Sequence, residues 1–262
     1  MLGLFRTSAP AKPEISIGRD FCQNGFVRIP EVFSREEIAA FRVAAIGALP
    51  SNSPPYRPQF SSTALFREPL RQVFHNPRFT GPLRSLLGDD FVFVNEFALH
   101  DSNYAGWHTD TTSPEAKAGH EFHWSPTYLV VQVAIDLQDN GKNGGGLDVV
   151  PRSHLADDPL AITMRGGKVA APYQGAVTIE SKAGDVVVFH LRTSHRATVS
   201  KSPARNDSER KLALFMVAGA NNASTRRYRE WLNEYDQMNR VKRPPIPAEF
   251  LEFMSSVGLQ II

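Results

Sequence analysis

The sequence predicts an α+β fold, mainly β, in which helices flank a central barrel or sandwich. Three observations support this prediction. Apolar residues at helical spacing dominate the first third of the chain, strand-forming residues fill the middle, and a helical apolar stripe returns near the end. With 262 residues, of which 42% are hydrophobic, the chain has enough apolar material for one domain with a sizeable core.

The N-terminal elements follow from capping and stop signals. A short strand is predicted over residues 25–30, and Ser34 with Glu37 forms a capping-box pattern for a helix that ends at Pro50. Two further short helices are expected from the apolar spacing before Gly88. We treat the chain as a single domain with four parts: 1–15 as a flexible lead-in, 16–88 as a helical N-terminal part, 90–220 as the β core and 224–262 as C-terminal helices.

Strand formers are concentrated in five segments, separated by glycine and asparagine clusters: residues 91–100, 128–135, 176–179, 186–191 and 212–217. This spacing is typical of an antiparallel β domain with short turns. After Ser224 an apolar stripe predicts a helix packed on the sheet, formed by Tyr228, Trp231, Leu232, Tyr235 and Met238.

Composition excludes several classes of protein. The formal charge is only +2 and the basic residues are scattered, which argues against nucleic-acid binding. The single cysteine, Cys22, permits no intramolecular disulfide, and no apolar segment has the length of a membrane span. We therefore expect a cytoplasmic monomer or small homo-oligomer that binds a small-molecule substrate and neither nucleic acid nor membrane.

The most informative motif is His108-Thr109-Asp110, together with the distant His195. Two histidines and one carboxylate form the facial triad that binds iron(II) and leaves three coordination positions open. Residues i and i+2 project the same way from an extended segment, so His108 and Asp110 suit a strand end or tight turn. His195 follows a Gly184-Asp185 turn and an apolar strand, which places it at the mouth of a barrel.

These motifs also resemble a known family. The segments Trp107 to Asp110, Gly144 to His154 and Gly184 to His195, with Asn24 to Pro30 before them, are similar to the phytanoyl-CoA dioxygenase family over roughly residues 18 to 220. The resemblance implies a double-stranded β-helix, a cupin-like jelly roll with flanking helices. It also implies iron(II), 2-oxoglutarate and O2 as cofactor and cosubstrates, with His108, Asp110 and His195 as metal ligands and catalytic centre.

The resemblance further implies a basic residue on the strand after the distal histidine, which pairs with the 5-carboxylate of 2-oxoglutarate. Arg210 fits this place, because a guanidinium fork grips a carboxylate with two hydrogen bonds. The loop from His195 is longer than usual in the family, so Arg205 and Lys211 remain alternatives. Retention of Asp110 makes hydroxylation the default, because halogenating relatives replace this carboxylate with a small residue.

Other polar residues are weaker candidates. Gln132 and Tyr128 are expected either to line the cosubstrate pocket or to be buried core groups, and Thr198 to contact a carboxylate or to be an ordinary strand residue. His123 is expected to shape the substrate entrance, and Arg152 to point at the pocket or at water. His100, Asn103 and Tyr104 are the better candidates for substrate contact.

Alternative functions stay open at this stage. The same triad supports desaturation, cyclisation or epimerisation. His120 and His123 with Glu121 have the composition of a zinc site for a hydrolase, although their three-residue spacing is not that of a helical zinc-protease motif. A non-catalytic jelly-roll binding protein is the third class.

Overall fold

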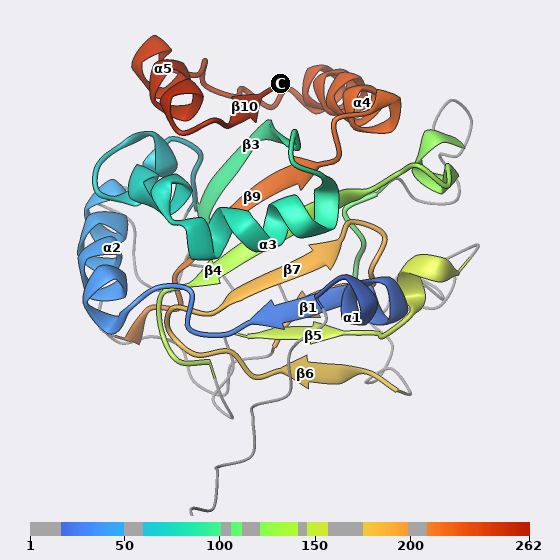
Figure 1. The fold of residues 1–262 in the computed structure, drawn as a ribbon, viewed down its shortest axis with the longest axis horizontal. Coiled ribbons are helices and arrows are strands. Elements are labelled where there is room, and N and C mark those ends of the chain that lie inside the picture. The colour runs from blue at the N-terminus through green and yellow to red at the C-terminus, as the bar shows by residue number, and fades with distance from the viewer. Residues whose placement is uncertain are drawn as a thin grey trace, which may run out of the picture.

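The computed structural model describes residues 17–49, 60–100, 106–111, 121–140, 146–156, 175–198 and 209–262. In these ranges, helices cover one face of a large β-sheet and a small second sheet packs against the other face (Figure 1). The α-helices are α1 (Ile17–Asn24), α2 (Arg35–Ala48), α3 (Pro77–Leu87), α4 (Ala223–Asn239) and α5 (Ala248–Ser256). The 3-10 helices are η1 (Ala64–Phe66), η2 (Leu70–His75), η4 (Glu121–Trp124) and η5 (Ser153–Leu155).

The larger sheet has the strand order β1-β7-β4-β9-β3-β10, with β2 paired to β3, and the smaller sheet has the order β6-β5-β8. Neighbouring strands are antiparallel except for β10 on β3. The strands are β1 (Phe26–Ile29), β2 (Phe60–Ser61), β3 (Val92–His100), β4 (Val130–Asp136), β5 (Leu147–Val149), β6 (Val177–Ile179), β7 (Val186–His190), β8 (His195–Ala197), β9 (Ala213–Gly219) and β10 (Gln260–Ile261). The predicted α+β fold with a jelly-roll core is confirmed.

Alternation along the strands divides the larger sheet into two faces. On β4, Val133 and Ile135 belong to the main core, which they share with α2 and α3. Their neighbours Gln132 and Ala134 point the other way and line a cavity between the two sheets. The helix-covered face therefore stabilises the sheet, while the opposite face is available for a site.

Helix α2 begins where the capping signal predicts. Ser34 Oγ accepts a hydrogen bond from Glu37 N at 3.1 Å, and the Glu37 carboxylate accepts one from Ser34 N at 2.7 Å. Ile38 and Phe41 then pack into the core from the buried side of α2. Helix α1, which buries Phe21, was not singled out from the sequence because it is only eight residues long.

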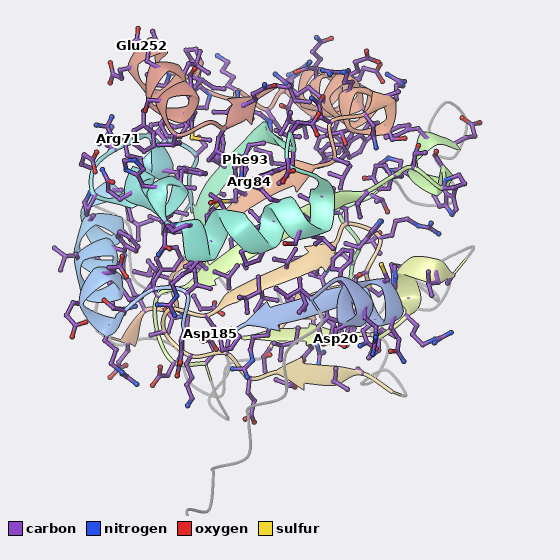
Figure 2. The ribbon with its side chains drawn as sticks, viewed as in Figure 1. Asp20, Arg71, Arg84, Phe93, Asp185 and Glu252 are labelled. Carbon is purple, nitrogen blue, oxygen red and sulfur yellow. The ribbon has the colours of Figure 1, made fainter. Side chains whose placement is uncertain are left out.

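The turn that precedes β7 is held by one buried carboxylate, Asp185 (Figure 2). It accepts hydrogen bonds from Arg28 Nη1 at 2.8 Å and from Glu31 N at 2.9 Å. Gly184 has a φ of +93°, and its carbonyl accepts from Phe33 N at 3.1 Å. The predicted Gly-Asp turn is thus tied to the N-terminal part, which fixes where β7 enters the core.

Helix α4 is present where the stripe predicts it, but its boundary and contacts differ in detail. Asn222 caps it, and the Asn222 side chain accepts from Thr225 N at 3.0 Å. Tyr228 is buried, whereas Tyr235 and Met238 are 43% and 70% exposed, so their predicted packing on the sheet is wrong. They lie in the later turns of α4, beyond the cluster that buries Tyr228. No helix in the described part of the chain combines the length and apolar character needed to span a bilayer.

Candidate active site

The two histidines of the predicted triad are joined by direct backbone pairing. His108 N donates to His195 O and His195 N donates to His108 O, both at 2.9 Å, which makes an antiparallel bridge. Asp110 N donates to Leu191 O at 3.0 Å, so the third residue of the triad is also anchored by its main chain. The segment that carries His108 and Asp110 and the distant segment that carries His195 are therefore joined by backbone hydrogen bonds.

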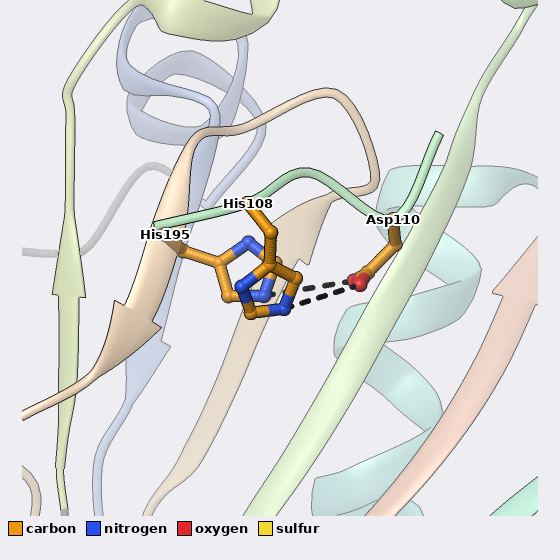
Figure 3. A group of neighbouring side chains, drawn as sticks. All are labelled: His108, Asp110 and His195. Atoms are coloured by element: carbon orange, nitrogen blue, oxygen red, sulfur yellow. Dashed lines mark ion pairs between the residues drawn. The ribbon is translucent and has the colours of Figure 1, made fainter. Parts of the chain in front are cut away.

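The side chains converge on a common point (Figure 3). His108 Nε2 lies 3.7 Å from Asp110 Oδ1, and His195 Nε2 lies 3.7 Å from Asp110 Oδ2. One ligand atom from each residue falls within 4.8 Å of the others. Two ligand atoms that each lie about 2.1 Å from one divalent ion are at most about 4.2 Å apart, and the two 3.7 Å separations fall within this limit.

Hydrogen bonds orient both rings for metal binding. Nδ1 of His108 lies 2.9 Å from Gly106 O, and Nδ1 of His195 lies 2.9 Å from Thr193 O. A carbonyl only accepts, so each Nδ1 carries the proton and each Nε2 presents its lone pair, as a metal requires. Burial lowers the pKa of His195 to about 4, against the opposing charge of Asp110, so its ring is neutral at neutral pH. The donor set therefore fits iron(II).

The triad forms part of the wall of a cavity of about 380 Å³. Cross-strand register defines its floor, because Asp136 and His100 both pair with Ala213 on β9. The next row joins small and aromatic side chains from four strands: Ala98, Phe215, Ala134 and Val187. Leu147 and Ala197 of the smaller sheet complete the wall opposite this floor. A volume of this size is typical of a small-molecule site.

Arg210 and Lys211 point to opposite faces of the sheet. Alternate residues of an extended chain face the same side, so Lys211 shares a face with Ala213 and Phe215, and all three line the cavity. Arg210 has the same parity as Leu212, which is in the helix-side core, and Arg210 is not among the lining residues. Arg205 lies outside the described residues. Of the two candidates Arg210 and Lys211, Lys211 is thus the one brought to the cavity, which Lys242 and Arg243 also line.

The other proposed cosubstrate residues lie in different places. Gln132 lines the cavity. Tyr128 is buried, and its hydroxyl has no hydrogen-bond partner among the described residues. Thr198 Oγ1 donates to Asp148 Oδ1 at 2.8 Å, and Thr198 is not among the lining residues. The carboxylate that Thr198 contacts is thus that of Asp148, and its predicted role in cosubstrate binding stays a prediction.

The proposed substrate residues also lie in different places. His100 lines the cavity, at the same level as Asp136, and burial lowers its pKa. His123 is fully buried, with its ring centroid 5.1 Å from that of Tyr128 and 5.4 Å from that of Trp231. It is thus placed in an aromatic core rather than at an entrance.

Arg152 is exposed, has a φ of +68° and donates its backbone N–H to Asn24 O, and it does not line the cavity. Asn103 and Tyr104 lie outside the described residues. So does His120 of the proposed zinc site, whose partner His123 is buried as described above. Within the described ranges, the triad is the group of His, Cys, Asp and Glu side chains that could hold a metal ion.

Two acidic residues of the cavity were not singled out from the sequence. Asp136 is buried, which raises its pKa to about 6, although Ser181 Oγ donates to it at 2.5 Å. Glu96 is half-buried on β3 near Asp110, and burial also raises its pKa. A sequence signal for both existed, since each is an acidic residue in or next to an apolar strand. Acidic residues are rarely buried without a partner or a functional role.

Comparison with known proteins places the chain in a family. The model of the family described as phytanoyl-CoA dioxygenase (PhyH) matches residues 21–207. The chain belongs to the phytanoyl-CoA dioxygenase family. The predicted resemblance is confirmed, and with the triad it makes the protein an iron(II)- and 2-oxoglutarate-dependent oxygenase-type enzyme that uses O2. No curated protein matches the chain in sequence.

Solved structures share the fold at low sequence identity. HygX from Streptomyces hygroscopicus, with nickel and 2-oxoglutarate bound, is 19% identical with a TM-score of 0.61, over 77% of this chain and 85% of that one. The carbocyclase SnoK from nogalamycin biosynthesis is 19% identical with a TM-score of 0.55, over 90% of this chain and 94% of its own. The epimerase SnoN, in complex with Fe3+, α-ketoglutarate and nogalamycin RO, is 18% identical with a TM-score of 0.56, over 78% and 82%. At these identities the likeness shows a shared fold.

Proposed function

We propose that this enzyme hydroxylates an unactivated C–H bond of a small molecule, with release of succinate and CO2. The observation that carries the proposal is a three-ligand metal site set in the wall of a 380 Å³ cavity with a cationic side chain, Lys211, on the same wall. A metal site alone would fit many functions. The added cavity and cation fit a dicarboxylate cosubstrate beside a small-molecule substrate.

The protein residues would bind, orient and exclude water. His108, Asp110 and His195 would hold iron on one face, and the bound metal, 2-oxoglutarate and oxygen together supply the oxidising power for C–H cleavage. Lys211 would pair with the distal carboxylate of 2-oxoglutarate, in place of the Arg210 predicted from the sequence. The apolar floor, including Phe215, would exclude water from the reacting centre.

Retention of Asp110, which can take a ligand position, disfavours halogenation and leaves hydroxylation as the default outcome. The similar structures include an epimerase and a carbocyclase, so epimerisation and cyclisation by the same triad are alternatives, and desaturation is a third. HygX and SnoN are described with hygromycin B and nogalamycin RO bound, which supports a small-molecule substrate for this chain as well.

The test begins without a substrate. Iron(II) and 2-oxoglutarate are added to the protein in the absence of oxygen, and a visible charge-transfer band that requires both is the expected result. His108→Ala should abolish the band because one of three ligands is lost. Absence of the band in the unmodified protein, with no iron bound, would overturn the proposal. Where it forms, succinate release in air and mass analysis of the product distinguish a gain of one oxygen atom from a loss of two hydrogens.

A further inference from the structure

A carboxylate outside the triad lines the same cavity as the triad. Glu96 is on the inner face of β3 and lines the cavity. Phe97 and Val133 both pair with Met216 of β9, so Glu96 lies level with Gln132. Lys211 lies several residues further along the sheet, beyond Asp136, so Glu96 is at the opposite end of the cavity from Lys211. Its charge interacts with that of Asp110 in the triad.

The carboxylate of Glu96 is held in place but is not fully neutralised. Tyr228 Oη donates to Glu96 Oε2 at 2.6 Å, which fixes one oxygen. Arg243 Nη2 lies 3.6 Å from Glu96 Oε1, which is longer than a hydrogen bond between these groups. The Glu96 side chain is 28% exposed, and it lines the cavity.

Arg243 is mainly the partner of another acid. Its Nη2 donates to Asp236 Oδ1 at 3.2 Å, and its Nε donates to Asp236 Oδ2. This two-point pairing occupies the fork that would otherwise grip a carboxylate. Arg243 therefore pairs more closely with Asp236 than with Glu96, although both Glu96 and Arg243 line the cavity.

The surroundings of Glu96 favour a cation there. Burial raises the pKa of Glu96, and the charges of Asp110 and Asp236 raise it further, whereas Arg243 and Tyr228 oppose the rise. A positively charged group in contact would reverse this effect. An anionic group in the same place would meet the carboxylates of Glu96 and Asp110, and one edge of the Arg243 guanidinium is already paired with Asp236.

We propose that Glu96 binds a protonated amine of the substrate, so that the enzyme acts on a small molecule with an amino group close to the carbon that reacts. Tyr228 is a positioning residue for this carboxylate. The inference rests on the proposed function, because it takes the cavity beside the triad as the substrate site. It adds the chemical class of the substrate and the residue that selects it.

The test uses four probes that share one ring: benzylammonium, benzyl alcohol, N-benzylacetamide and benzoate. Each is titrated by calorimetry into the anaerobic protein loaded with iron(II) and 2-oxoglutarate. A single partly buried ion pair with a small apolar contact supports a dissociation constant on the order of 1 mM. We expect benzylammonium to bind at least about tenfold more tightly than the other three probes.

Variants separate the role of Glu96 from general effects. Glu96→Gln keeps an acceptor for Tyr228 but removes the charge, and should weaken benzylammonium binding at least about tenfold. Glu252→Gln removes an exposed acid from α5 (Figure 2) and should change nothing. If Glu96→Gln fails to fold, Tyr228→Phe replaces it, with an expected loss of about threefold or more because the carboxylate is no longer fixed.

Four results would overturn the inference: equal binding of amine and alcohol, preference for benzoate, no amine binding up to about 100 mM, or amine binding that survives Glu96→Gln. The last would indicate direct ligation of the amine to the metal. Each of these is read in protein that still forms the iron and 2-oxoglutarate band. Loss of that band in the unmodified protein would instead overturn the proposed function, so the two failures are distinguishable.

Discussion

Exchange of Lys211 or Arg210 for methionine should affect 2-oxoglutarate binding very differently. Methionine removes the charge of each side chain and keeps most of its length, so the two variants form a matched pair. Lys211 shares the cavity face with Ala213 and Phe215. Arg210 shares the parity of Leu212 on the other face, so only Lys211→Met should remove a charge from the cosubstrate site.

The magnitude follows from the surroundings of Lys211. A hydrogen bond to a charged group contributes about 1.5–3 kcal/mol, and loss of one partner from a desolvated charge pair costs about 2–5 kcal/mol. Lys211 is half-buried, so the lower part of these ranges applies. A loss of about 2 kcal/mol corresponds to roughly 30-fold weaker 2-oxoglutarate binding. Lys211→Arg restores the charge and should recover most of this loss.

The assay is an anaerobic titration of 2-oxoglutarate into iron(II)-loaded protein, followed by the charge-transfer band. Iron affinity, measured separately, should be the same in Lys211→Met and the unmodified protein, because Lys211 is not a metal ligand. Arg210→Met should weaken 2-oxoglutarate binding by less than about threefold. The reasoning from strand parity would be refuted if Arg210→Met caused the large loss and Lys211→Met the small one.

Three further predictions concern the frame around the cavity. Arg42 Nη2 donates to Arg210 O at 2.8 Å, so Arg42→Met should loosen the segment that leads into β9. The KM for 2-oxoglutarate should then rise several-fold while the KM for substrate stays nearly constant. Equal changes in the two KM values would contradict this prediction. Folding raises the pKa of Asp136 from 3.8 to about 6. Ionisation of this carboxyl should therefore lower the free energy of unfolding of the protein by up to about 3 kcal/mol as pH rises from 4 to 6, and should contribute little further change above pH 6. Thermal unfolding against pH should show a smaller decline over this window for Asp136→Asn, and an unaltered slope would refute the assignment. Gly184→Ala would place a Cβ 2.2 Å from Phe33 O at a φ of +93°. Urea unfolding should therefore show that the free energy of unfolding falls by about 3 kcal/mol or more. The control Gly18→Ala should change it little, because nothing lies within 4 Å of that Cβ.

Much of the fold could be predicted because its signals are local. The capping box at Ser34 and the stop at Gly88 depend only on residues within a few positions, and both appear where expected. The short strands β5 and β8 were not predicted. Strands of three residues carry too little alternation to be recognised, and they exist because they pair with one another.

The residues of the candidate site could be identified from the local sequence, but their convergence depends on tertiary structure. The residue types and spacing of His108, Asp110 and His195 indicated a facial triad, because iron(II) requires that donor set. The convergence itself depends on the backbone bridge between His108 and His195, which forms only when distant segments pair. The choice between Arg210 and Lys211 depended on strand register, since a shift of one residue moves a side chain to the other face.

The sequence by itself therefore determined the class of fold, the candidate metal ligands and the family, because each of these is encoded by residue type at short spacing or by motifs in a fixed order. Tertiary structure alone decided which side chains share the cavity. Glu96 and Asp136 look like ordinary acids in the sequence, and only the pairing of β3, β9 and β4 brings both to the wall of the cavity that the triad also lines. Cavity composition depends on which faces of distant strands meet, and that information appears in the chain only after it has folded.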